Sequence, residues 1–159
     1  MASQPTHEDV NLILRLYELR RDPKMRAARD WFSNAFKPAL SIEEFNSMCP
    51  PGSEPNAYFR MVVSYWEMVA SFVTSGVLHR ELFFQSGQEL FFVWEKIHEM
   101  VPKWREIMKD PAICNNLETV AGQFREWRSQ KSPEWYAIFA NAVLGQLPEQ
   151  QRGDSSPQS

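Results

Sequence analysis

A glutamate and a histidine three residues apart form the most suggestive chemical pair in this 159-residue sequence. Glu95 and His98 would lie one turn apart on the same side of a helix. Carboxylate-bridged di-iron bundles use this pair, but they need it twice, together with further glutamates from two other helices. Because His7 and His79 have no glutamate three residues before them, the second pair is missing. We therefore expect no metal or other cofactor, with His98 bordering an apolar face and Glu95 pairing with a neighbouring helix.

A single carboxylate interrupts the most apolar stretch of the chain. Glu67 lies between Trp66 and Met68. A buried carboxylate needs a partner or takes a raised pKa, so a buried Glu67 would be a candidate functional acid. The alternative is that Glu67 lies at the edge of its helix and meets an arginine, or contacts His98 across two central helices.

Six positive charges gather where two predicted helices join. Such a patch could bind phosphate or an acidic partner, but no helix-turn-helix spacing or aromatic stacking platform accompanies it. We interpret it as a solvated face. The formal net charge of −3 gives no whole-chain attraction to phosphate, so no nucleic-acid partner is expected. The six residues are Arg15, Arg20, Arg21, Lys24, Arg26 and Arg29.

The two cysteines form no catalytic or metal-binding motif. Cys49 precedes Pro50, Cys114 lies in a predicted helix, and neither has a neighbouring histidine. A nucleophilic role would need a base from elsewhere in the chain. A disulfide between the two remains an open alternative.

Tryptophan and phenylalanine are plentiful, with 6 and 11 residues respectively. Trp66, Phe91 and Trp94 could line a pocket for a small apolar ligand, with Glu67 or His98 as its polar anchor. The alternative is that these aromatic side chains fill the core.

Two pairs of consecutive phenylalanines raise a separate question. Phe83-Phe84 and Phe91-Phe92 cannot all face one core from a helix, because adjacent helical residues point in different directions. We therefore predict that Phe83, Phe84 and Phe92 meet a partner chain or a second layer.

The elements that position these residues all show the helical period. From Gln88 to Val101, apolar residues at helical spacing are widened by further apolar residues on other sides. A helix that is apolar nearly all round must be covered nearly all round, so we expect it to be the central rod of a bundle. Pro55–Ser75 is predicted to be the longest helix and its antiparallel neighbour.

Capping and X-Pro signals divide the rest of the chain, and no strand candidate remains. Starts are expected at Thr6, at Asp22-Pro23 and at the capping-box sequence beginning with Ser41. Pro102 should kink or restart the helix, and Asp110-Pro111 should start the next one. We predict one all-α domain of about six or seven helices over residues 1–147, followed by a disordered polar tail over 148–159.

A membrane location is not favoured by the sequence. The apolar run from Met61 to Leu78 contains Glu67 near its middle, where an ionised carboxylate would be costly in lipid. The first residues, MASQPTHEDV, carry neither a basic region nor an apolar run, so we expect no signal peptide and a cytoplasmic chain.

Three segments resemble a family of small bacterial all-helical proteins that is catalogued as a domain of unknown function. They are Tyr65-Trp66-Glu67, Gly76 to Phe83, and Phe92-Val93-Trp94-Glu95. The resemblance spans roughly Leu12 to Arg128 and implies the helical fold, but it implies no activity. Members often carry an amino-terminal membrane anchor, which this sequence lacks, so membrane association is not carried over.

Three functions stay open on these observations. We expect first a non-catalytic interaction or regulatory module that binds itself as a homodimer or binds another protein, which requires exposed apolar surface. The alternative is a helical binder of a small apolar ligand, which requires an enclosed void. An enzyme or metalloprotein comes third, since a metal site requires a second acidic cluster near Glu95 and His98.

Overall fold

The protein is all-α, as predicted from the helical period. The structure is a computed structural model, and it describes residues 3–145, apart from the side chain of Leu144. Within that range it contains no strand. Its nine helices are α1 (His7–Leu19), α2 (Pro23–Asn34), α3 (Ile42–Met48), α4 (Glu54–Thr74), α5 (Arg80–Phe84), α6 (Gln88–Ile97), α7 (Val101–Met108), α8 (Asn115–Lys131) and α9 (Trp135–Leu144).

Several helices begin where the capping residues predict. Thr6 and Asp9 form a capping box at the start of α1, because Asp9 N–H donates to Thr6 Oγ1 and Thr6 N–H donates to Asp9 Oδ2. Asp22 accepts the first backbone N–H groups of α2, and Ser41 accepts the N–H of Glu44 in α3. The side chains that cap these three starts therefore come from residues within a few positions of them in the sequence.

Two predicted boundaries are wrong, and both lie around α7. The rod that begins at Gln88 ends at Ile97 rather than at Val101, and α7 restarts the helix with Pro102 in its first turn. Asp110-Pro111 does not start α8, because the Asp110 carboxylate accepts the N–H of Ala112 in a local turn. The chain then passes through a left-handed Cys114, and α8 begins at residue 115.

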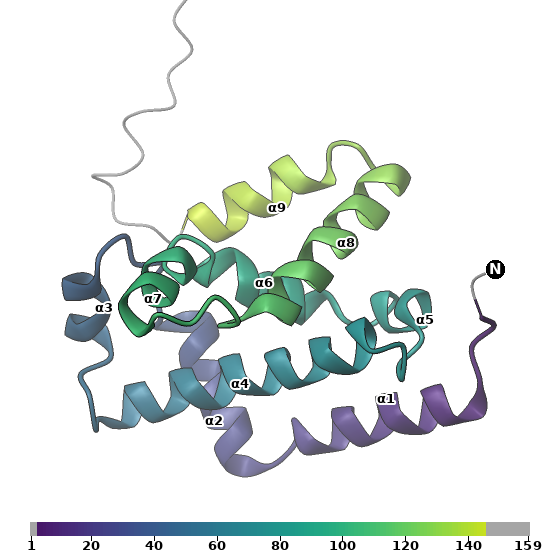
Figure 1. The fold of residues 1–159 in the computed structure, drawn as a ribbon, viewed down its shortest axis with the longest axis horizontal. Coiled ribbons are helices and arrows are strands. Elements are labelled where there is room, and N and C mark those ends of the chain that lie inside the picture. The colour runs from purple at the N-terminus through teal and green to yellow at the C-terminus, as the bar shows by residue number, and fades with distance from the viewer. Residues whose placement is uncertain (1–2, 146–159) are drawn as a thin grey trace, which may run out of the picture.

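The helices form layers around α4 and α6. The 21-residue α4 packs against α2, α6 and α8, while α6 also packs against α8 and α9 (Figure 1). Figure 1 shows α1 lying along α4 at one edge of the molecule and the α8–α9 hairpin at the opposite edge. Since α6 is covered from both sides, its predicted place at the centre of the bundle agrees with the structure.

The two central helices, α4 and α6, fill the core mainly with large apolar side chains. From α4, Val62, Trp66 and Val69 are at most 2% exposed, and from α6, Leu90 and Ile97 are at most 1% exposed. Burial on this scale is the main favourable contribution to folding. Because these side chains face the core, they also determine which way the remaining sides of α4 and α6 point, and therefore where the polar residues of the two helices lie.

Two further predictions concern the tail and the membrane. The predicted polar tail over 148–159 lies outside the described residues. Among the helices that the structure describes, none is long and apolar enough to cross a membrane, including α4, which contains much of the apolar run from Met61.

Candidate functional site

Trp66 and Glu67 point to different sides of α4. Trp66 lines a cavity of only about 20 Å³ between α1 and α4, and its buried indole Nε1 has no hydrogen-bond partner there. Glu67 instead faces α8, where its carboxylate accepts the backbone N–H groups of Asn116 at 3.1 Å and Leu117 at 2.8 Å. Glu67 therefore serves as the N-terminal cap of α8, which has no capping side chain of its own.

The other three residues of the predicted ligand pocket lie elsewhere. Phe91 packs in the α6–α8–α9 layer, with its ring centroid 5.5 Å from that of Phe124 and 5.2 Å from that of Phe139. The Trp94 ring lies 6.2 Å from the ring of His98, on the same helix face. Their environments differ from that of Trp66, so the structure does not gather the five residues around one cavity.

Two of the three predicted interface phenylalanines are buried within the chain itself. Phe83 and Phe84 are 5% and 3% exposed, and the Phe84 ring lies 5.4 Å from that of Phe124 in α8. Phe92 is half-buried, with its ring edge toward Phe32 in α2. Within the described residues, Phe84 is therefore covered by α8 and Phe92 is partly covered by α2.

Glu95 and His98 form a local pair next to α9. Burial raises the pKa of the Glu95 carboxyl, although nearby His98 and the hydroxyl of Tyr136, which donates to Glu95 Oε2 at 3.3 Å, oppose the shift. The imidazole is held by its own helix, with Nδ1 3.0 Å from the carbonyl oxygen of Glu95. In residues 3–145, no cluster of three or more histidine, cysteine or acidic side chains is arranged to hold a metal ion.

Lys96, between those two residues, is the polar side chain that sequence reasoning missed. It is 1% exposed, and its Nζ donates to the carbonyl oxygens of Phe32, Ser33 and Phe36 at 2.9, 3.0 and 2.9 Å. These carbonyls end α2, where a positive charge is favourable. Burial, with a smaller contribution from Lys37, lowers the pKa of Lys96 to about 8. The sequence did contain a signal for this burial, because Lys96 lies in a helix that is apolar nearly all round.

The basic patch is partly an internal clamp. Arg29 binds the carboxylate of Glu89 with two hydrogen bonds of 2.7 Å, and Arg20 adds a third of 3.0 Å. These contacts join α1 and α2 to the start of α6. Arg15 pairs with exposed Glu18. The residues available to an anion are therefore fewer than the six that the sequence suggested.

Both cysteines are free and buried. Burial raises the pKa of each thiol to about 11, so both stay protonated at neutral pH and are poor nucleophiles. The open alternative of a disulfide between them is not realised in the structure.

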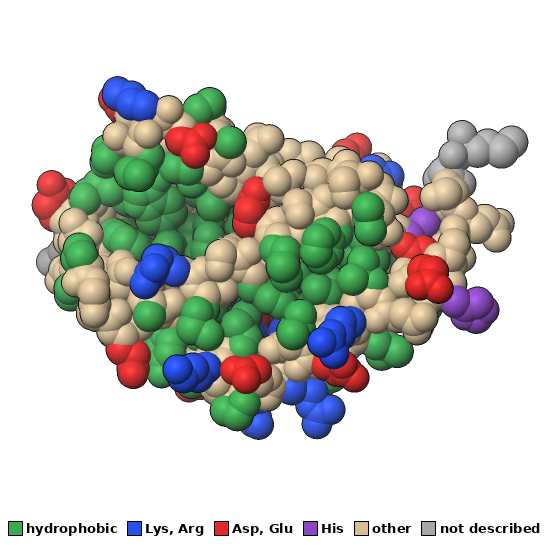
Figure 2. Space-filling model, turned by 60° about the horizontal axis from the view of Figure 1, so that its bottom comes forward, with side chains coloured by type: hydrophobic (Ala, Val, Ile, Leu, Met, Phe, Trp, Pro, Cys, Tyr) green, Lys and Arg blue, Asp and Glu red, His purple; other side chains and the backbone are tan. Residues whose placement is uncertain are grey.

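An apolar hollow lies on the first half of α4, and we call it the α4 groove. It is open to solvent, has a volume of about 620 Å³, and appears on the left of the face in Figure 2. Among the residues that the structure describes, two charged side chains line it, Arg60 and Glu67, and the carboxylate of Glu67 is held by α8. Its lining consists of Ala57, Phe59, Arg60, Met61, Val63, Ser64, Glu67 and Cys114.

The sequence also indicates the α4 groove, although the residues concerned lie next to core residues and are easily taken for part of the core. The consecutive residues Met61, Val62 and Val63 put apolar side chains on three sides of α4, whereas only Val62 is buried in the core. Met61 and Val63 stay half-buried at the groove. A helix with apolar surface beyond its core stripe has a second surface to cover.

Comparison with known proteins gives a family and no activity. The model of a domain of unknown function, DUF4760, matches residues 5–127, from the start of α1 into α8. No curated protein and no solved structure matches the chain. The match agrees with the resemblance that the sequence segments suggested.

Proposed function

The chain belongs to the DUF4760 family, and we propose that it is a non-catalytic protein-interaction module that binds a second copy of itself through the α4 groove. The observation that carries this proposal is the groove itself, an open apolar hollow of about 620 Å³ along the first half of α4. Apolar surface that a chain leaves in water gains free energy when another protein covers it. A groove along a helix is a common receptor for apolar side chains of a partner.

The chemistry of the groove favours a protein over a reacting substrate. Its apolar lining residues, such as Ala57 and Met61, cannot donate or accept protons, and the thiol of Cys114 stays protonated. Glu67 is occupied as the cap of α8. Binding by shape and apolar contact is the activity that these residues support.

The small-ligand alternative has less support. The aromatic side chains expected to enclose a ligand pack against one another, as Phe91 does with Phe124 and Phe139. The cavity beside Trp66, at about 20 Å³, has room for about one water molecule. No observation therefore favours this function as a second candidate.

Two methionines on α4 allow a matched test. Met61 lines the groove, whereas Met68 is 38% exposed on the same helix and is absent from the groove lining. We expect Met61→Arg to convert the dimer to single chains and Met68→Arg to leave it intact, as measured by size-exclusion chromatography with light scattering. Circular dichroism of both variants checks that the helical fold is kept.

Two outcomes would overturn the proposal. One is a wild-type chain that stays single at every concentration. The other is a dimer that survives Met61→Arg but is lost in Met68→Arg, which would move the contact to the face formed by α1 and the second half of α4.

A further inference from the structure

We propose that the tip of α7 from the second copy fills the α4 groove, an inference that rests on the dimer proposed above and adds which residues enter the groove. The tip is the last turn of α7, in which Ile107 and Met108 are 59% and 66% exposed. Adjacent helical residues point in different directions, and Ile107 lines a separate open hollow beside α3, so Met108 is the apolar side chain of the tip that projects as a groove requires.

The tip of α7 lies beside the groove of its own chain. Trp104, one turn before the tip, packs edge-on against Phe59, with 5.4 Å between ring centroids, and Phe59 lines the groove. After the left-handed Lys109, the short connection to α8 returns to Cys114, which also lines the groove. Protrusion and hollow therefore belong to one surface.

A surface that holds both shapes can pair with itself. In a dimer with two-fold symmetry, the same patch is used by both copies, so any contact between a residue i and a residue j occurs twice. Each α7 tip can then enter the groove of the other chain at the same time. A groove without a neighbouring protrusion would instead require a different partner protein.

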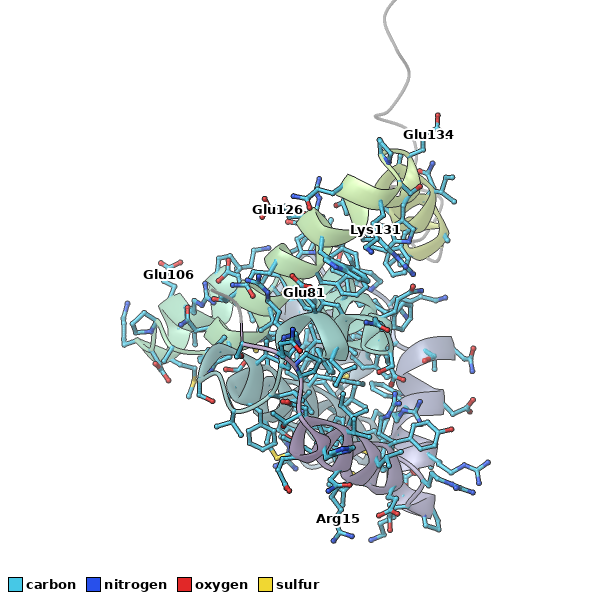
Figure 3. The ribbon with its side chains drawn as sticks, turned by 90° about the vertical axis from the view of Figure 1, so that its right-hand side faces the viewer. Arg15, Glu81, Glu106, Glu126, Lys131 and Glu134 are labelled. Atoms are coloured by element: carbon cyan, nitrogen blue, oxygen red, sulfur yellow. The ribbon has the colours of Figure 1, made fainter. Side chains whose placement is uncertain are left out.

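The charges on this surface are complementary under the same symmetry. Arg60 stands exposed at the groove, and Glu106 precedes the two apolar residues of the tip, projecting from the molecule in Figure 3. In the part of the chain that the structure describes, neither side chain makes an ion pair or hydrogen bond. Pairing Arg60 with Glu106 of the second copy would give both a partner. Rim pairs of this kind contribute mainly to register and specificity.

The polar end of this chain does not supply a competing occupant. Residues 148–159, PEQQRGDSSPQS, contain no hydrophobic side chain other than proline, so they offer no apolar anchor for the groove. The second copy has the anchor and the matching charge on one helix.

Charge reversal and rescue test the pairing. We expect Arg60→Glu and Glu106→Arg each to raise the dimer dissociation constant about tenfold, because each creates two like-charge contacts per dimer. The double variant should return to within about threefold of wild type, since both pairs are restored in reverse. Sedimentation velocity over a dilution series measures the constants, and Arg15→Glu on exposed α1 is the control that should not change them.

The outcomes separate this inference from the dimer itself. A wild-type dimer that is unaffected by both single reversals and by Met108→Asp, yet is lost in Met61→Arg, would overturn the α7 tip and leave the proposed function standing. The pairing would also be overturned if the loss of dimerisation free energy in the double variant equalled the sum of the losses in the two single variants. A wild-type chain that never dimerises would overturn both proposals and leave the groove to another protein.

Discussion

Lys96 occupies the centre of the protein because the end of α2 provides acceptors in place of water. An ammonium group moved out of water is costly unless hydrogen bonds replace its hydration. Three carbonyl oxygens within 3.0 Å of Nζ do so, and the negative end of the α2 dipole adds to them. Lys96 thus joins α2 to α6 through these hydrogen bonds, and no acidic side chain among residues 3–145 forms an ion pair with it.

The lowered pKa of Lys96 predicts how stability changes with pH. The folded chain releases this proton near pH 8 and the unfolded chain near 10.5, so between these values the unfolded state binds more protons. Stability should therefore rise by about 2 kcal/mol from pH 8 to pH 10. Urea denaturation of Lys96→Met should lack this rise, while exposed Lys24→Met should keep it. If stability still rises between pH 8 and pH 10 in Lys96→Met, another titrating group causes the rise.

Glu67 shows a cap supplied across helices. Its carboxylate receives two backbone N–H groups of α8 and the side-chain amide of Asn116 at 2.8 Å. Removing such a cap leaves donors unpaired at a helix start. We expect Glu67→Ala to lower the free energy of unfolding by about 1–2 kcal/mol.

A matched control for Glu67 lies on α8. Glu126→Ala, at an exposed position, should change stability by less than about 0.5 kcal/mol. Both changes are best measured in the Met61→Arg background, so that dissociation of a dimer does not contribute to the unfolding curve. Equal effects of the two substitutions would contradict the capping role.

At the scale of elements, Glu89 joins the first two helices to α6. Its carboxylate carries three arginine hydrogen bonds, and its side chain is 23% exposed, against 15% for Arg20 and 28% for Arg29. Partial burial strengthens such a clamp relative to a surface pair, although solvent still screens it.

Glu89→Ala should destabilise the protein by about 2 kcal/mol, because two partly buried guanidinium groups lose their counter-charge. Glu18→Ala removes an exposed pair with Arg15 and should cost less than about 0.5 kcal/mol. Thermal unfolding of both variants at low and moderate salt measures the difference. If Glu89→Ala destabilises the protein no more than Glu18→Ala does, the clamp contributes no more to stability than an exposed ion pair.

The sequence predicted those features of the fold that depend on residues close together in the chain. Helical period and caps at Thr6, Asp22 and Ser41 gave the class and several starts, since these signals involve residues a few positions apart. The acceptors of Lys96, by contrast, lie 60 to 64 positions away, and the partners of Glu67 lie 49 or 50 positions away. Only the assembled bundle brings these groups together, and it also supplies the cover for Phe83 and Phe84.

The end of α6 and the start of α8 were missed for a related reason. A helical pattern continues through residues 98–101, but the chain turns at Ile97 so that α7 can place Trp104 against Phe45 and Phe59. At α8, the proline signal is overridden because the cap comes from Glu67 on another helix.

For the whole molecule, the layers explain why the α4 groove stays open. Along α4, the buried residues Val62, Trp66, Val69 and Val73 follow one stripe, against which α2, α6 and α8 pack. On the opposite side of its first half, Phe59 meets Trp104 of α7, and Cys114 of the α7–α8 connection lines the open hollow. The α4 groove is therefore a consequence of how nine helices cover a 21-residue one.

The central claim, that this open surface binds a second copy, is tested most directly by sedimentation velocity of the wild-type chain. We predict that an 18.6 kDa species at low concentration converts to a species of two chains as concentration rises. A series up to about 100 µM detects association as weak as about −5.5 kcal/mol. A single 18.6 kDa species throughout that series would contradict the claim.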